Sequence, residues 1–144
     1  MNTGLSVFDR TVQEANTWLR DVQSRLAPCD RQAAYSGLRA VLHVLRDRLP
    51  MEAVIGLSAQ LPMLLRGLFL EGWRPVGGQS DLSDVDAFAA AVGERLPPNF
   101  PRQPNEVAEA VLAAMAEHLD PGETAKLARF LPARLRPLFP REYV

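Results

Sequence analysis

An internal repeat with an offset of 70 residues organises this sequence. Residues 17–69 align with residues 87–139 without a gap, and fifteen of these 53 positions carry the same residue. Chance in a chain of this composition gives about four identities. Most of the shared residues are apolar: Val22, Arg25, Leu26, Pro28, Ala40, Val41, Leu42, Leu49, Leu57, Leu61, Pro62, Leu65, Arg66, Leu68 and Phe69, each with its counterpart 70 positions later. We therefore expect a duplication that has kept a packing pattern.

Each repeat has the pattern of short helices separated by prolines. Apolar residues recur every three or four positions, which is the spacing of one face of a helix, and no stretch alternates with period two. We expect an all-α, compact helical bundle: a single domain over 1–144 with a first repeat at 6–74, a linker at 75–82, a second repeat at 83–139 and a tail at 140–144. A repeat of short helices cannot bury its apolar faces alone, so the two repeats should pack on each other around one core.

Charge and composition narrow the classes of partner. The net charge is −1, with 47% hydrophobic and 23% charged residues, so nothing favours nucleic acid as a partner. No apolar run approaches the roughly 20 residues that span a bilayer, so we expect no membrane association. Cys29 has no second cysteine to pair with, and the start of the chain lacks the pattern of a signal peptide. The expected location is the cytoplasm.

Four segments are specific enough to indicate a family. They are LRAVLHVLRDRLP at 38–50, QLPMLLRG at 60–67, EGW at 71–73 and FDRTVQ at 8–13. The chain resembles the bacterial domain-of-unknown-function 2267 family from about Phe8 to Phe139. This resemblance implies an all-helical fold and no established activity, so it supplies no catalytic residues.

The sequence shows no recognisable catalytic or metal-binding set. His43 and His118 have no carboxylate or cysteine at ligand spacing, and we expect both to face solvent. Cys29 falls in a turn where its thiol could be exposed, but no histidine or asparagine pattern around it indicates an activated nucleophile. We therefore predict a protein that is not an enzyme, with no cofactor and no metal.

Four residues are candidates for an interaction site. Trp73 and Arg74 are the last residues of the first repeat, and the second repeat has no tryptophan, so Trp73 is either a recognition anchor or a clasp that holds the linker on the core. Arg66 and Arg136 are equivalent in the repeat. Each could contact a partner or close an ion pair between the repeats.

These observations leave two functions open. The first is a non-enzymatic module that binds a protein partner or forms a homo-oligomer through a groove between the two halves. The second is a binder of a small apolar molecule in a cavity between the repeats, since helix bundles host such sites. A ligand-sized cavity would favour the second function, and an exposed apolar patch beside Trp73 would favour the first.

Overall fold

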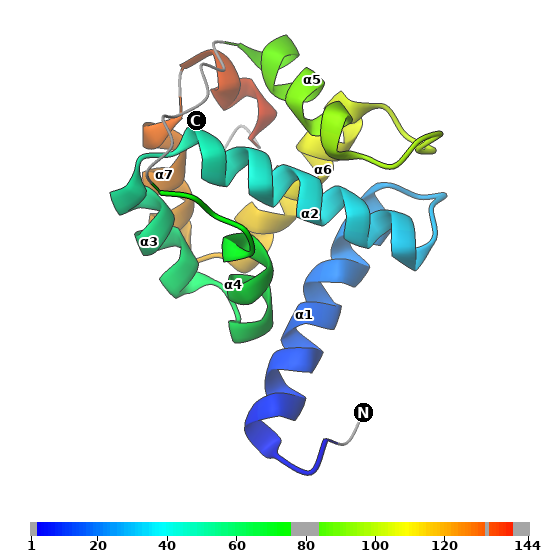
Figure 1. The fold of residues 1–144 in the computed structure, drawn as a ribbon, viewed down its shortest axis with the longest axis vertical. Helices are drawn as coiled ribbons and strands as arrows, with labels where there is room; N and C mark the ends of the chain where they lie inside the picture. The colour runs from blue at the N-terminus through cyan, green and yellow to red at the C-terminus, as the bar shows by residue number, and fades with distance from the viewer. Residues whose placement is uncertain (1–2, 76–83, 132, 140–144) are drawn as a thin grey trace.

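The computed structural model describes residues 3–75, 84–131 and 133–139, and over these residues the fold is all-α (Figure 1). The first half contains α1 (Ser6–Arg25), α2 (Arg31–Arg48), α3 (Met51–Gln60) and α4 (Met63–Leu70). The second half contains α5 (Val85–Arg95), α6 (Pro104–His118), α7 (Pro121–Phe130) and the 3₁₀ helix η1 (Ala133–Leu138). The expected all-helical class is confirmed. Of the expected linker, only Pro75 is among the described residues, and the tail at 140–144 lies outside them.

Short polar side chains and prolines set the helix ends. Asp30 Oδ1 accepts a hydrogen bond from Ala33 N at 2.7 Å at the start of α2, and Asp84 Oδ1 accepts one from Ala87 N at 2.8 Å at the start of α5. Pro50 and Pro62 occupy the N-cap positions of α3 and α4, where the missing N–H costs nothing. The joints between α2 and α3 and between α3 and α4 are therefore only two residues long.

The helix bounds of the two halves correspond at the offset found in the sequence. The bounds of α3 and α7 differ by 70 positions at both ends, and α2 and α6 end 70 positions apart. Their C-cap residues, Leu49 and Leu119, both have extended backbone. A common origin of the halves stays a prediction.

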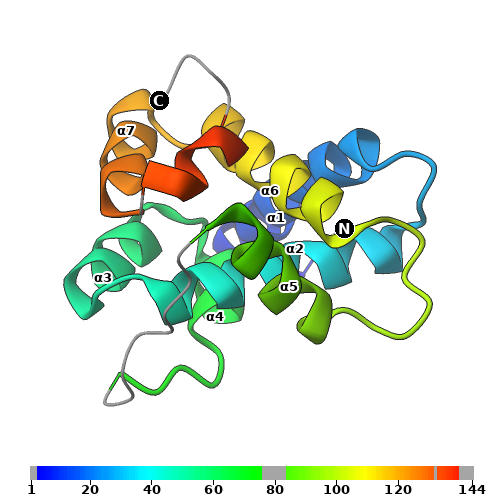
Figure 2. The same cartoon turned by 90° about the horizontal axis from the view of Figure 1, so that it is seen from above.

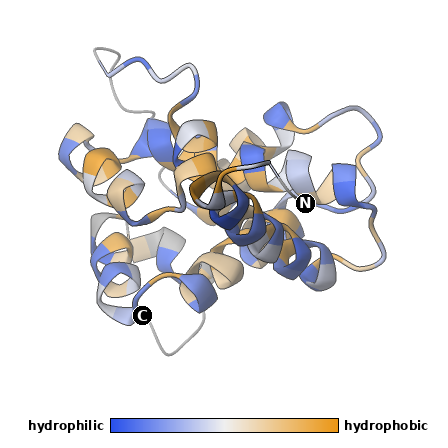
Figure 3. Cartoon of the chain, turned by 90° about the horizontal axis from the view of Figure 1, so that it is seen from below, coloured by the Kyte–Doolittle hydropathy of each residue, from blue (hydrophilic) through white to orange (hydrophobic). Residues whose placement is uncertain are grey.

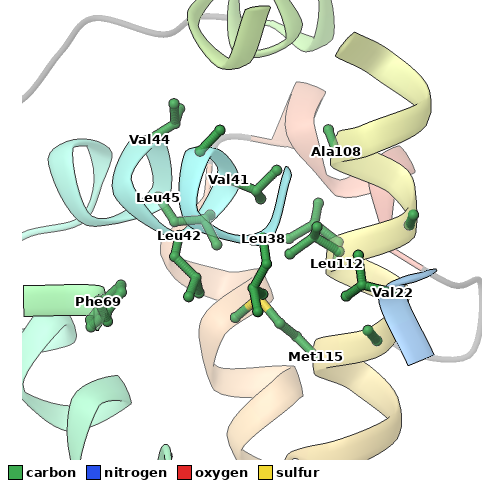
Figure 4. Packing of buried hydrophobic residues seen from close by; sticks show 14 of the residues in the cluster. Val22, Leu38, Val41, Leu42, Val44, Leu45, Phe69, Ala108, Leu112 and Met115 are labelled. Carbon is green, nitrogen blue, oxygen red and sulfur yellow. The ribbon is translucent and has the colours of Figure 1, made fainter. Parts of the chain in front are cut away.

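One cluster of buried residues draws side chains from both halves. At its centre, α2 packs against α1, α4, α5 and α6. Leu38 and Val41 of α2 point toward Leu112 and Met115 of α6 (Figure 4), and all four are buried. The cluster fixes the relative positions of the helices that carry the surface described below.

The first half of α1 projects away from this core (Figure 1). The buried residues of α1 are Trp18, Leu19 and Val22, all in its second half. The N-terminal end of the helix, in dark blue, extends below the other helices in this view. We call the N-cap residue Leu5 and the first ten residues of the helix, together residues 5–15, the outer part of α1.

Candidate interaction surface

Large apolar side chains are exposed where α1 and α4 begin. Leu5, Val7 and Phe8 of the outer part of α1 are about half exposed, as are Met63 and Leu64 of α4. Leu64 N donates a 2.8 Å hydrogen bond to Thr11 Oγ1, which ties the start of α4 to the outer part of α1. Figure 3 looks onto this end of the molecule. The two helix starts therefore lie side by side, with Val7 and Met63 lining one cleft and Leu64 another.

A single apolar stripe runs along α1 from this surface into the core. Leu5, Phe8, Val12, Ala15 and Leu19 are spaced by three and four residues, the spacing of one helix face. Leu19 is 9% exposed, whereas Phe8 is 48% exposed. The same face that anchors α1 in the core thus continues past the end of the body.

The stripe leads into a groove of about 420 Å³ between α1, α2 and α4. We call it the α1–α2–α4 groove. Its walls are mostly apolar and include Ala15, Leu19, Tyr35, Leu38, Leu64, Leu65 and Leu68. Arg31 and Glu71 also line it. Arg31 Nη2 hydrogen-bonds Asn16 Oδ1, and Glu71 pairs with Arg39 at 3.1 Å. The groove is apolar inside and charged at its rim.

A second, more polar cleft of about 550 Å³ lies between α1, the start of α4 and the end of α6. His118 stacks on Trp18 there, with ring centroids 5.3 Å apart and an interplanar angle of 26°. His118 Nε2 lies 3.0 Å from Asp21 Oδ2. The expectation of a solvent-facing His118 is therefore wrong, because the ring joins the end of α6 to α1.

His43 was also expected to face solvent and is instead buried, with 2% exposure. Its Nε2 lies 2.8 Å from Leu68 O. Arg46 Nη1 donates to Phe69 O and Glu71 O at 3.2 and 2.6 Å. Burial lowers the pKa of His43, and the nearby arginines lower it further, while the bond to Leu68 raises it. The neutral imidazole and the guanidinium thus hold the carbonyls at the end of α4.

The four residues singled out in the sequence lie at different places. Trp73 is half-buried and packs against the core, whereas Arg74 is exposed. Arg66 lines the polar cleft and donates through Nε to Ser58 O at 2.8 Å. Arg136 Nε donates to Ala128 O at 3.3 Å. The predicted ion pairs are wrong for the described residues, since these arginines instead hold carbonyls at the ends of α3 and α7.

Several clefts are lined by residues of both halves, the polar cleft at His118 among them, and the one between α3 and α7 is small. α3 and α7 lie side by side (Figure 2) and enclose about 230 Å³. Its lining includes Gly56 and Leu57 of α3 with Lys126 and Leu127 of α7, which are equivalent positions of the repeat. This is below the roughly 300 Å³ at which pockets for drug-sized ligands begin.

The outer part of α1 is the element that sequence reasoning misjudged. Phe8 and Val12 fit the helical stripe, and a stripe predicts a buried face. The alignment of the repeats begins at residue 17, however, so the sequence of the outer part of α1 has no matched segment in the second repeat. The lack of a matched segment in the alignment was the sequence signal that the apolar stripe of α1 extends beyond the core.

The remaining chemistry-bearing groups do not gather. Cys29 is half-buried rather than exposed, its Sγ lies 3.8 Å from Gln23 O, and burial raises the pKa of its thiol. In the part of the chain that the structure describes, no three His, Cys, Asp or Glu side chains are placed to hold a metal ion. None of the described helices is long and apolar enough to cross a membrane.

One protein-family model matches the chain over residues 15–138, and its description is "Uncharacterized conserved protein (DUF2267)". The match starts at Ala15, so most of the outer part of α1 precedes it. No curated protein matches the chain.

Proposed function

Because the chain belongs to the DUF2267 family, whose description names no activity, its function has to be inferred from its surface, and we propose that it is a non-enzymatic protein-interaction module. The module binds an amphipathic helix in the α1–α2–α4 groove and along the outer part of α1. The proposal places it in the cytoplasm of a bacterium, in keeping with a single cysteine and hence no internal disulfide.

The observation that carries this proposal is the continuity of the apolar surface. Leu64 belongs both to the exposed cluster and to the wall of the groove, so the two form one strip. Contiguous apolar patches larger than a few hundred Å² on a protein surface mark sites of interaction. A groove between helices takes an amphipathic helix through anchors spaced by three and four residues.

The chemistry around this surface supports binding rather than catalysis. His43 and His118 each hold another element in place through a hydrogen bond. The raised pKa of Cys29 disfavours the thiolate that a nucleophile needs. Each of these groups thus has a structural role that accounts for its position.

The second candidate is a binder of a small apolar molecule. The α1–α2–α4 groove has the volume and the apolar lining for one. The exposed side chains that continue along α1 favour a longer occupant, since a small molecule would leave Leu5 and Phe8 uncovered.

Native mass spectrometry of the protein, purified gently from its own host, separates these functions. A stoichiometric protein partner or a defined homo-oligomer is the expected result, lost in Leu64→Glu and kept in Ile55→Glu. Ile55 is 55% exposed on α3 and is a matched control for a charge placed on an exposed apolar position. A bare monomer overturns the proposal, and a monomer that retains a few hundred daltons of extra mass favours the small molecule.

A further inference from the structure

The polar cleft between α1, the start of α4 and the end of α6 carries charges of both signs. Arg10 and Glu14 line it from the outer part of α1, and Arg66 lines it from α4. We propose that this cleft binds a short apolar peptide with free ends, a dipeptide, through its ammonium group and its carboxylate. The cleft shares no lining residue with the α1–α2–α4 groove, so this inference does not rest on the proposed function.

The three charges are not neutralised within the part of the chain that the structure describes. None of Arg10, Glu14 and Arg66 forms an ion pair with another described residue. Arg10 precedes Glu14 by four residues, which is the less favourable order for an ion pair along a helix, and both side chains are exposed. A simple anion would be repelled by Glu14, and a simple cation by the two arginines. A ligand with one group of each sign satisfies all three.

Arg66 is already held in the position from which it would bind. Its Nε donates to Ser58 O at 2.8 Å and its Nη2 donates to Leu61 O at 3.1 Å. Nη1 of the same guanidinium has no hydrogen-bond partner among the described residues. A guanidinium fixed in this way loses little conformational entropy when its free N–H groups bind a carboxylate. The ligand carboxylate therefore lies at Arg66 and Arg10, and the ammonium lies at Glu14.

The spacing of the charges matches a dipeptide. Four residues of helix separate Arg10 from Glu14, which is about 6 Å along the axis. Two extended residues span at most about 7 Å, so the two ends of a dipeptide are separated by a similar distance. The amino and carboxyl groups of a single amino acid are attached to the same carbon and lie closer together.

The size and the apolar part of the lining also suit this ligand. The cleft has a volume of about 550 Å³, within the range of roughly 300–1,000 Å³ for small-molecule sites. Val7 and Met63 line it and are 51% and 52% exposed. Apolar side chains of the peptide would cover both residues, and the burial of this apolar area favours binding.

Nuclear magnetic resonance titration of the purified full chain with L-leucyl-L-leucine tests the site. We expect saturable binding with a dissociation constant of about 0.1–1 mM, from the usual affinity per atom of a ligand of this size. The shifted amide signals should come from lining residues of the cleft, such as Thr17 and Met63. No saturation at concentrations up to about 10 mM overturns the inference. Shifts that gather on Tyr35 and Leu68, in the α1–α2–α4 groove, also overturn it.

Two variants assign the two charges of the ligand. Glu14→Gln should weaken binding of the dipeptide about three- to tenfold, the range for a partly exposed charged hydrogen bond, but leave binding of its N-acetyl form unchanged. Arg10→Gln should weaken the dipeptide to a similar degree, but leave its C-terminal amide unchanged. Arg20→Gln is the matched control, because Arg20 is an exposed arginine of α1 outside the cleft. A Glu14→Gln variant that weakens the dipeptide and its N-acetyl form equally overturns the assignment.

Free L-leucine tests the length of the ligand. It carries the same two charges closer together and has one apolar side chain, so it should bind at least tenfold more weakly than the dipeptide. Equal affinity for leucine overturns the dipeptide as the ligand. None of these outcomes bears on the proposed function, because that function is tested by Leu64→Glu in the groove.

Discussion

At the scale of single residues, His43 links the pH of the solution to the stability of the fold. The buried ring donates from Nε2 to Leu68 O as the neutral form, among cations from Arg39, Arg46 and Arg95. Its pKa is lowered in the folded chain, whereas the unfolded chain protonates the same ring at about pH 6.5. Just below that pH the unfolded state binds more protons. The contribution of His43 is therefore full above pH 6.5 and declines as the pH falls toward the lower folded value.

We expect His43→Gln to flatten part of this dependence. The glutamine amide can donate to Leu68 O but does not titrate. Urea unfolding at pH 7.5 and pH 5.5 should show a larger loss of stability for the wild type than for the variant. Carboxylates titrate in both proteins, so they cancel in the comparison. Equal losses would contradict the role given to His43.

Arg66 and Arg136 hold equivalent carbonyls with unequal strength. Arg66 donates to Ser58 O at 2.8 Å and to Leu61 O at 3.1 Å, whereas Arg136 is bonded to Ala128 O at 3.3 Å. We expect Arg66→Met to lower the free energy of unfolding by about 1–3 kcal/mol, because it leaves helix-end carbonyls unpaired. Arg136→Met should cost less. Urea titrations of the two variants check the order, and a larger loss at Arg136 would reverse it.

At the scale of helices, α2 shows where the sequence pattern stops being informative. The spacing of Ala34, Leu38, Val41 and Leu45 predicts one buried face, and that face is confirmed. In the structure every residue from Ala40 to Arg46 is buried. Four helices surround α2, so its polar positions are enclosed as well. Periodicity identifies the most apolar face of a helix, but not the neighbouring helices that cover its other faces.

The surroundings of Trp73, in the segment after α4, also could not be predicted from the sequence pattern. The sequence allowed an anchor or a clasp, and an exposed patch beside Trp73 was the expected sign of an anchor. Trp73 instead packs half-buried against the core, and its backbone N–H donates to Leu70 O at 3.0 Å. Among the described residues, five of the eight exposed large apolar side chains lie instead at the starts of α1 and α4, and the other three are on α2 and α3.

Trp73→Ala should therefore act on stability rather than on association. We expect it to lower the free energy of unfolding by about 1–3 kcal/mol, less than the cost of deleting a fully buried tryptophan. The partner or homo-oligomer detected by native mass spectrometry should be retained. Thermal unfolding and native mass spectrometry of the same variant check both parts, and weakened association with unchanged stability would restore Trp73 as an anchor.

At the scale of the whole molecule, the two halves contribute matched residues to one core. Leu42 and Leu112 are 70 positions apart, both have 0% exposure, and both belong to the same buried cluster. The sequence predicted these positions because core packing leaves a periodic apolar record. The sequence could not predict that the start of α1 is exposed. An apolar stripe shows which face of a helix is apolar, but not which element covers that face.

We expect Leu42→Ala and Leu112→Ala each to cost roughly 2–5 kcal/mol of unfolding free energy, by lost burial and by the cavity left behind. Ile55→Ala, at an exposed position, should stay within about 0.5 kcal/mol. Equilibrium denaturation measures all three. Values near zero at both leucines would contradict a core shared by the two halves.

Because the apolar stripe of α1 is continuous, the direction in which its exposed end faces depends on the number of residues that separate this end from the core. An α-helix turns about 100° per residue, so seven residues inserted between Phe8 and Val12 return the face that carries Phe8 to within about 20° of its original direction. Five inserted residues swing it by about 140°. With seven extra residues at this point, α1 would be longer and the side chain of Phe8 would still face the same side of the molecule. With five extra residues, Phe8 would face solvent on another side.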